Sequence, residues 1–271
     1  MPHHHNHGHD HHSDDHRRHH HLEQESLLVI RPNSGLAGDI MVAGLLAVSG
    51  AGQAELDALL SDLRLEQLIG RVKLVERQVN EVTGVGLAVD LPHEHEHRGL
   101  KDIENFFAET RISDQAKALA IKSFRILAEA EGAVHNRRPD EVHFHEVGAL
   151  DSIMDMGLAS ALVSGLNPGR IISGPLPICD GVVRCAHGLL PSPAPAVLRL
   201  LEGVPVVGLN SLGETITPTA VALLKAFDTE FGPWPAILLE RQSLAYGTRI
   251  LEGVPNGAIF AFGRFHGLGR A

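Results

Sequence analysis

Aromatic side chains and cysteines are both scarce in this sequence of 271 residues. Phe, Trp and Tyr together make up 4% of it, so aliphatic side chains must fill the interior. The hydrophobic content of 44% is enough for a sizeable core. Two cysteines in a chain of this length do not make a disulfide framework, which predicts a reduced, cytoplasmic setting.

The sequence also lacks an excess of basic residues and long apolar runs. Lys and Arg number 23 against 33 Asp and Glu, and the formal net charge of −10 is the opposite of a nucleic-acid-binding surface. No apolar run approaches the roughly 20 residues that cross a bilayer, and we see no signal peptide. We therefore expect neither a nucleic acid nor a membrane among the partners.

Histidine, by contrast, is concentrated at the N-terminus. Eleven of the 19 histidines lie in the first 21 residues. Neutral imidazole is the commonest side-chain ligand for nickel, zinc and copper. The segment has almost no apolar residues, so we interpret residues 1–25 as a disordered metal-binding tail. An expression tag is the alternative, although Asn6, Gly8 and Asp10 interrupt the run in a way that engineered tags do not.

The remainder, residues 26–265, has the pattern of one α/β or α+β domain, in which a mixed sheet packs against helices. Hydrophobic patterning predicts strands at 27–31, 72–78, 84–91, 171–172, 176–179 and 182–185, two or three more within 236–263, and helices at 40–48, 54–63, 100–107, 114–130 and 151–162. Asp180-Gly181 predicts a tight hairpin. Ser192-Pro193 and Thr217-Pro218 each predict an N-cap followed by a first-turn proline.

The segment from Asn33 to Asp39 joins a predicted strand to a predicted helix. Gly35 and Gly38 allow the backbone to approach a ligand closely, and the helix start offers free N–H groups to a phosphate. Thr217 and Thr219 offer the same chemistry at a second helix start. A tight turn in the first case and an ordinary helix cap in the second are the alternatives.

His143-Phe144-His145-Glu146 is a candidate metal-binding segment. In an extended chain, His143 and His145 point to one face and Phe144 to the other, so the two imidazoles can chelate one metal. Asp151 and Asp155 lie one helical turn apart and can converge on the same place. A buried structural histidine pair, and an acid favoured by the helix dipole at 151, are the alternatives.

Two further segments carry possible metal ligands. Cys185 and His187 combine a thiolate with an imidazole, which suits nickel, although Cys185 can equally be a buried structural cysteine or, with His187, a nucleophile. A disulfide between Cys179 and Cys185, or shared ligation, is conceivable. His93, His95 and His97 form a loop that resembles the tail, and we interpret it as a mobile metal-capture loop or simply a solvated one.

Taken together, these blocks resemble the LarC family of nickel insertion proteins, from about Leu27 to Phe262. The resemblance is carried by SGLAGD (34–39), HFHEVGALDSIMD (143–155), RCAHGLLPSPAP (184–195), the segment 214–220 and, in shortened form, YGTR (246–249). Cys179 stands where the family has a glycine, so no family role falls on it. Family members carry a further C-terminal domain associated with nucleotide binding, and we expect this chain to lack it.

The resemblance implies a nickel chelatase of the lyase class. Such a protein inserts Ni(II) into pyridinium-3,5-bisthiocarboxylic acid mononucleotide, so that two sulfurs and one ring carbon hold the metal. The product is the nickel-pincer cofactor of lactate racemase. The family reaction uses CTP with Mn(II) or Mg(II). The implied partners are the nucleotide precursor and apo lactate racemase. Either a separate chain also supplies the C-terminal domain, so that this chain is half of a split chelatase, or this chain performs less than the full chelatase reaction.

The residues and the resemblance together give a set of candidate roles. Glu146, Asp151 and Asp155 are candidates to orient ligands or to accept the ring proton, and Glu146 or Asp151 is favoured as the base that a carbon–nickel bond requires. The residues expected to bind the substrate are Ser34, Gly35, Gly38, Asp39, Thr217 and Thr219. The residues expected to bind nickel are His143, His145, Cys185, His187, His93, His95 and His97. A nickel storage or delivery protein without catalysis is the main alternative. A metal-dependent hydrolase that uses His143, His145 and Asp151 is the second.

Overall fold

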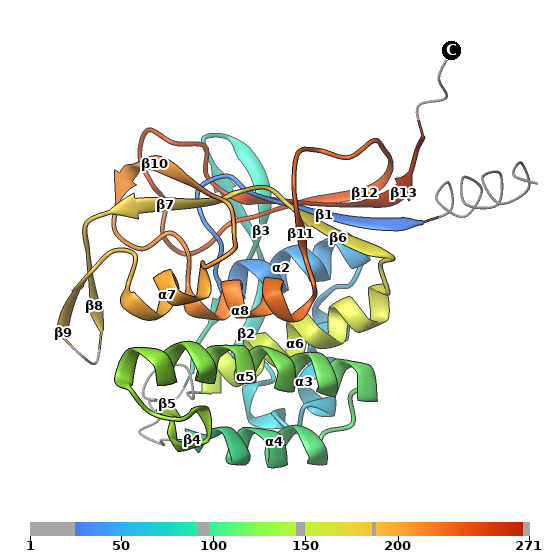
Figure 1. Ribbon diagram of the computed structural model, residues 1–271. Coiled ribbons are helices and arrows are strands. Elements are labelled where there is room, and N and C mark those ends of the chain that lie inside the picture. The colour runs from blue at the N-terminus through green and yellow to red at the C-terminus, as the bar shows by residue number, and fades with distance from the viewer. Residues whose placement is uncertain (1–24, 92–97, 145–149, 186–187, 268–271) are drawn as a thin grey trace, which may run out of the picture.

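The computed structural model describes residues 25–91, 98–144, 150–185 and 188–267 (Figure 1). The tail predicted at 1–25 lies, apart from Glu25, outside these residues. So does the histidine-rich loop at 93–97. The fold class expected from the sequence, a mixed sheet with packed helices, is confirmed by the described residues.

A mixed sheet of seven strands forms one layer of the molecule. In spatial order its strands are β11 (Glu230–Phe231), β6 (Arg170–Ser173), β1 (Ser26–Pro32), β13 (Ala258–Phe265), β12 (Ile237–Ala245), β3 (Val82–Val89) and β2 (Val72–Val79). β1 lies near the middle, parallel to β6 and antiparallel to β13. Its residues 27–30 are fully buried, which explains why they read as an unbroken apolar run rather than an alternating one.

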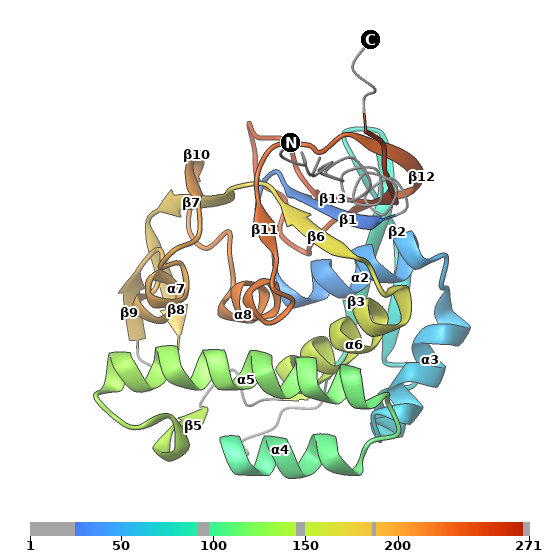
Figure 2. The same ribbon diagram turned by 45° about the vertical axis from the view of Figure 1, so that its right-hand side comes forward.

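Seven helices of the described chain lie on one side of this sheet, as two views show (Figures 1 and 2). They are α2 (Gly38–Ser49), α3 (Gln53–Asp62), α4 (Leu100–Glu109), α5 (Asp114–His135), α6 (Leu150–Leu166), α7 (Pro195–Leu200) and α8 (Pro218–Ala226), with short 3-10 turns at Glu66–Leu68 and Pro139–Glu141. α2 packs against β3, β12 and β13 on one side and α6 on the other. α5 in turn packs against α6 and α8.

The core lies between the sheet and these helices. α2 contributes Met41, Leu45 and Leu46, all without exposed surface, and β1 contributes Leu28 and Ile30. α6 is buried along most of its length because it is enclosed by α2, α5 and α8. None of the helices within the described ranges is long and apolar enough to cross a membrane.

Three pairs of shorter strands lie outside the main sheet, and one corrects a prediction. β7 (Leu176–Asp180) pairs with β10 (Val206–Leu212), β8 (Val182–Cys185) with β9 (Gly188–Pro191), and β4 (Arg98–Gly99) with β5 (His143–Phe144). The hairpin predicted at Asp180-Gly181 is therefore wrong. A two-residue hairpin turn of the predicted kind needs positive φ at both residues, whereas only Gly181 has one here (127°), and the Asp180 carbonyl accepts from Gly213.

Two other local predictions need adjusting. The helix expected after Ser192-Pro193 begins two residues later, with Ala194 as N-cap and Pro195 in its first turn, and the peptide bond between Ser192 and Pro193 is cis. α5 continues to His135 instead of ending at Ala130, and it stops where Asn136 adopts left-handed geometry (φ 50°). The cap predicted at Thr217 is confirmed, because its hydroxyl accepts from the amide of Ala220 at 3.3 Å.

Candidate functional site

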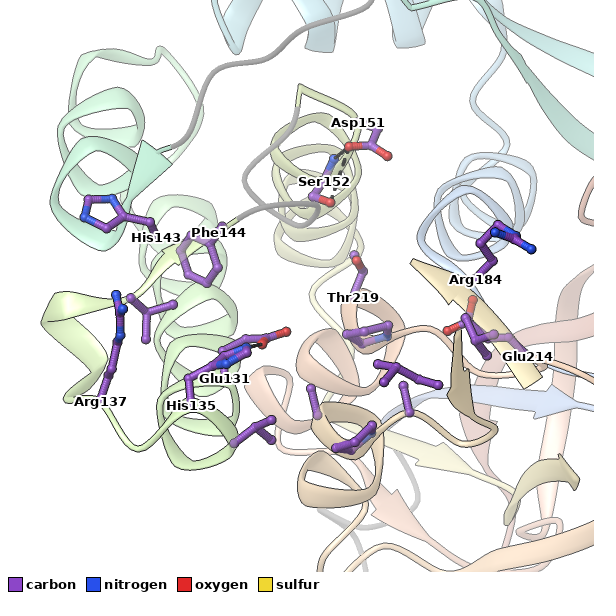
Figure 3. Close-up of a pocket in the computed structure, with 18 residues that line it drawn as sticks. Glu131, His135, Arg137, His143, Phe144, Asp151, Ser152, Arg184, Glu214 and Thr219 are labelled. Carbon is purple, nitrogen blue, oxygen red and sulfur yellow. Dashed lines mark hydrogen bonds and ion pairs between the residues drawn. The ribbon is translucent and has the colours of Figure 1, made fainter. Parts of the chain in front are cut away.

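Three adjoining cavities form one cleft at the ends of α2, α6 and α8. The main cavity, of about 560 Å³, lies between the end of α5, the start of α6 and the β8–β9 ribbon (Figure 3). The acidic cavity, of about 370 Å³, contains Asp39, Asp151 and Asp155, and the loop cavity, of about 260 Å³, lies beside residues 34–40. Asp151 and Thr219 line both the main and the acidic cavities, and Asp39 lines both the acidic and the loop cavities.

The two segments expected at helix starts lie side by side. Leu36 and Ile216 form a parallel bridge, with Leu36 N donating to the Thr215 carbonyl (2.9 Å) and Thr217 N to the Leu36 carbonyl (3.1 Å). Gly35 makes this contact possible. Its φ is 143°, and a Cβ there would lie 2.2 Å from the Thr215 oxygen. The structure thus brings residues 34–39 together with residues 217–219.

Asp155 is a buried and strongly perturbed carboxyl group of the cleft. Its Oδ1 is buried and has no hydrogen-bond partner among the described residues. Its Oδ2 lies against Gly38, where an added Cβ would be 2.2 Å away. Burial raises the pKa of Asp155 well above its usual value, and the charges of Asp39 and Asp151 raise it further. Asp155 is therefore a carboxyl that holds its proton unusually firmly.

The other two carboxylates of the acidic cavity lie in the first turns of helices. Asp39 Oδ1 accepts from the amide of Ile40 (2.8 Å), and burial raises the pKa of this carboxyl, against the effects of that hydrogen bond and of the Arg77 charge. Asp151 is exposed, and its Oδ1 accepts from the amide of Ser152 (2.7 Å). Carboxylates at these positions match the partial positive charge of the helix starts.

His143 lies at the edge of the main cavity. It is exposed, whereas Phe144 is buried and packs edge-on against Phe124, with ring centroids 5.8 Å apart. The predicted alternation of the two side chains is therefore confirmed. His143 and Asp151 line the same cavity, on opposite walls (Figure 3), whereas Asp155 lines only the acidic one.

The remaining predicted ligands divide into two groups. His93, His95, His97, His145, Glu146 and His187 lie outside the described residues. Cys185 is the last residue of β8, where its backbone pairs with Gly188. Cys179 is a buried, free cysteine, which removes the conceivable disulfide. Within the described ranges, no group of three or more His, Cys, Asp or Glu side chains is placed to hold a metal ion.

Several cleft residues have no counterpart among the predicted site residues. Glu131 and His135 pair at 3.5 Å on the last turns of α5, and Arg137 follows them along the same wall. Arg184 and Glu214 line the opposite side (Figure 3). Arg184 could have been selected from the sequence, because it is the first residue of the family-like block at 184–195. Arg137 lies in no such block, and only the fold places it at the cleft.

The YGTR block closes the loop cavity. Arg249 donates to the main-chain carbonyls of Leu212 and Glu214, and the hydroxyl of Tyr246 donates to the carbonyl of Val82 (3.2 Å). Tyr246 and Arg249 therefore anchor their segment to neighbouring backbone, and all four residues of the block line this cavity. All five family-like blocks thus contribute described residues to the wall of one cleft, and the block at 184–195 contributes Arg184, Leu190, Ala194 and Pro195.

Comparison with known proteins agrees with this arrangement. The family model described as "Nickel insertion protein" matches residues 28–262, a range that includes all five of these blocks. The chain therefore belongs to the nickel insertion protein family.

Three curated relatives of the chain show its degree of sequence identity to known proteins. "Putative nickel insertion protein" of Syntrophotalea carbinolica is 40% identical over 231 residues, which cover 85% of this chain and 58% of that protein. Two relatives are named "Pyridinium-3,5-bisthiocarboxylic acid mononucleotide nickel insertion protein". The Nocardioides protein is 37% identical (83% and 56% covered), and the Staphylococcus saprophyticus protein is 31% identical (81% and 56% covered). The chain thus spans under three fifths of each relative, and no solved structure matches it.

Proposed function

We propose that this chain inserts Ni(II) into pyridinium-3,5-bisthiocarboxylic acid mononucleotide, the reaction for which two of the relatives above are named. The observation that carries the proposal is the meeting of the family-like blocks around one cleft, although they are far apart in the sequence. The cleft is large enough for a mononucleotide, since ligand pockets typically occupy about 300–1,000 Å³. Nickel is here a substrate that passes through the site.

Proton transfer is the first chemical requirement. When nickel bonds to the ring carbon, the C–H electron pair goes to the metal and the proton must be accepted by a base. Asp155 suits this role because a carboxylate with a raised pKa binds a proton more strongly than an ordinary one. The positive charges of the pyridinium ring and of Ni(II) favour its ionised form once both are bound. Asp151 and Glu146 remain the other candidates.

Nickel delivery is the second requirement. His143 lies at the edge of the main cavity, and we propose that His145, Cys185 and His187 join it in passing the metal inward. Nitrogen and sulfur donors suit nickel better than carboxylates do. The histidines at 93, 95 and 97 and those of residues 1–25 would gather the metal and supply it to this set.

Substrate binding is the third requirement. We assign it to the walls formed by Ser34, Gly35, Gly38, Asp39, Thr217 and Thr219. Of these residues, Asp39 adds its carboxylate to that of Asp151, and the two attract a cationic pyridinium ring to the cavity that also contains Asp155. Gly35 and Gly38 let the backbone of this wall pack against Thr215 and Asp155, where a Cβ on either glycine would lie 2.2 Å from an oxygen.

The family reaction also uses CTP with Mn(II) or Mg(II). Within the described ranges no group of three or more His, Cys, Asp or Glu side chains could hold such a metal ion, and we derive no step through that metal or through CTP. We extend the proposal to a lyase-type chelatase that works in the cytoplasm and passes its product to apo lactate racemase. Because the chain spans under three fifths of its relatives, the experiment below includes an arm with the C-terminal domain of a longer relative.

Nickel transfer in vitro tests the proposal. The full chain is mixed with the pyridinium nucleotide, Ni(II), CTP and Mn(II), with and without that added domain, and activation of apo lactate racemase is measured. We expect transfer by the wild-type chain in at least one arm. His143→Ala combined with His145→Ala should lower it strongly, and His266→Ala, an exposed histidine outside the cleft, should not.

The outcomes separate the alternatives. Transfer only with the added domain would make this chain half of a split chelatase. Tight nickel binding without transfer in either arm would refute the chelatase and favour storage or delivery. Undiminished transfer by the double histidine variant would refute the proposed delivery residues while leaving the activity in place.

A further inference from the structure

Arg137 and Arg184 differ from every other arginine in the described part of the chain. Each of the others donates a hydrogen bond, forms an ion pair or contacts a ring, as Arg125 does with Glu104, Arg170 with Glu230 and Arg199 with Glu202. Partners of these kinds are also present for the remaining described arginines, namely Arg31, Arg64, Arg71, Arg77, Arg98, Arg111, Arg138, Arg241, Arg249 and Arg264. The guanidinium groups of Arg137 and Arg184 have none among the described residues.

These two arginines both line the main cavity. Arg137 follows the end of α5 and Arg184 lies in β8, and Figure 3 shows them on opposite sides of the cavity. A guanidinium offers five N–H donors in a planar fork that fits phosphate and carboxylate groups, which explains its frequent use in binding such anions. Two such groups without partners among the described residues, facing one cavity in a chain of net charge −10, indicate a ligand with negative charge at both ends.

We propose that Arg137 binds the phosphate of the mononucleotide and Arg184 binds a thiocarboxylate of the same molecule. This inference rests on the proposed function, whose substrate carries a phosphate at one end and thiocarboxylates on its ring. Arg184 lies on the same side of the main cavity as Glu214, which also lines the loop cavity, so a ring bound at the wall formed by residues 34–39 would direct its thiocarboxylates toward Arg184. The phosphate then extends across the cavity toward Arg137.

The acidic cavity argues against the alternative place for the phosphate. The starts of α2 and α8 were predicted to hold it, but Asp39 and Asp155 lie beside the start of α2. A phosphate there would lie beside Asp39, whose negative charge would repel it, and would oppose the ionisation of Asp155 that the proposed base needs. The cationic ring and the metal suit that end of the cleft, whereas the anionic groups suit the two arginines.

Binding measurements can test the two subsites separately from catalysis. The affinities of the pyridinium mononucleotide and of the corresponding nucleoside, which lacks the phosphate, are measured by calorimetry on the full chain. The variants are Arg137→Gln, Arg184→Gln and the matched control Arg199→Gln, an exposed arginine on α7. Ribose 5-phosphate serves as a probe that carries the phosphate alone, and thermal unfolding checks that each variant is folded.

A distinct pattern is expected for each variant. Arg137→Gln should weaken binding of the mononucleotide and of ribose 5-phosphate about tenfold or more, as expected for a lost charge-assisted hydrogen bond, and leave the nucleoside unchanged. Arg184→Gln should weaken the mononucleotide and the nucleoside alike, and Arg199→Gln neither. Unchanged binding by both cavity variants would overturn the inference, and an exchange of the two patterns would overturn the assigned orientation.

The proposed function can fail independently of this inference. If the wild-type chain binds ribose 5-phosphate through Arg137 but does not bind the pyridinium compound, the phosphate subsite stands and the proposed substrate is wrong. If the mononucleotide binds with no dependence on Arg137, the substrate stands and the phosphate subsite is refuted. If the wild-type chain binds none of the three compounds, both are refuted.

Discussion

Replacing Asp155 with Asn should stabilise the protein at neutral pH while impairing nickel transfer. Asn has nearly the shape of a protonated Asp but cannot ionise, so it escapes the cost of a buried charge. The carboxyl of Asp155 is buried beside Gly38, its Oδ1 lacks a partner among the described residues, and Asp39 and Asp151 add like charge. Such trade-offs between stability and activity are common at functional sites.

The sign and size of the effect follow from proton linkage. Because the pKa of Asp155 is higher in the folded than in the unfolded chain, the folded state binds more protons between the two values. The free energy of unfolding therefore falls as pH rises from the unfolded pKa, about 3.9, to the folded pKa. The loss is about 1.4 kcal/mol for each pKa unit of the shift. The Asn variant should match the wild type below the unfolded pKa and exceed it increasingly above.

Urea denaturation at a series of pH values from 3 to 8 measures this difference. Asp140→Asn is a suitable control, because Asp140 is exposed and its pKa is lowered chiefly by a hydrogen bond from Arg138. That control should give no gain at neutral pH. A free energy of unfolding at pH 7 that is equal or lower in the Asp155 variant would refute the reasoning that this carboxyl is held at a cost.

Three further perturbations have defined outcomes. Gly38→Ala places a Cβ 2.2 Å from Asp155 Oδ2 and should lower the free energy of unfolding, measured by urea denaturation, by about 1–3 kcal/mol. The control Gly165→Ala, in open space on α6, should leave that free energy nearly unchanged. Equal effects of the two substitutions would contradict the packing argument. Thr217→Ala removes the α8 cap and should cost about 1 kcal/mol, which Thr217→Ser should restore. Deleting residues 1–21 should lower the nickel stoichiometry in equilibrium dialysis but leave a tight site, and loss of all tight binding would indicate storage.

Local features of the fold were predictable because local sequence determines them. Residues 27–30 lie in a strand because they are an unbroken apolar run, and Thr217-Pro218 begins a helix because the hydroxyl caps it and the proline fits the first turn. The prediction of a hairpin at Asp180-Gly181 was wrong because it considered only the local sequence. The partner of β7 is β10, which lies further along the chain, and such non-local pairing outweighed the turn preference of two residues.

The site was predictable in its residue types but not in its geometry. The helix-start residues 34–39 and 217–219 could be recognised separately, yet only the fold shows that Leu36 and Ile216 bridge them. The burial of Asp155 depends on the close approach of α2 at Gly38, which no periodicity reveals. Arg137 carried no signal, because an arginine after a helix is ordinary until a cavity is seen beside it.

The position of β1 has a consequence for how the protein is made. This first strand pairs along its whole length with β13, from Ser26 with Arg264 to Pro32 with Ala258. During synthesis the edge of β1 that pairs with β13 stays unpaired until nearly all of the described chain has left the ribosome. Contacts between such distant segments slow folding, and exposed apolar strands promote aggregation. We therefore expect newly made chains to depend on chaperones until β13 emerges, and the cleft to exist only after that point.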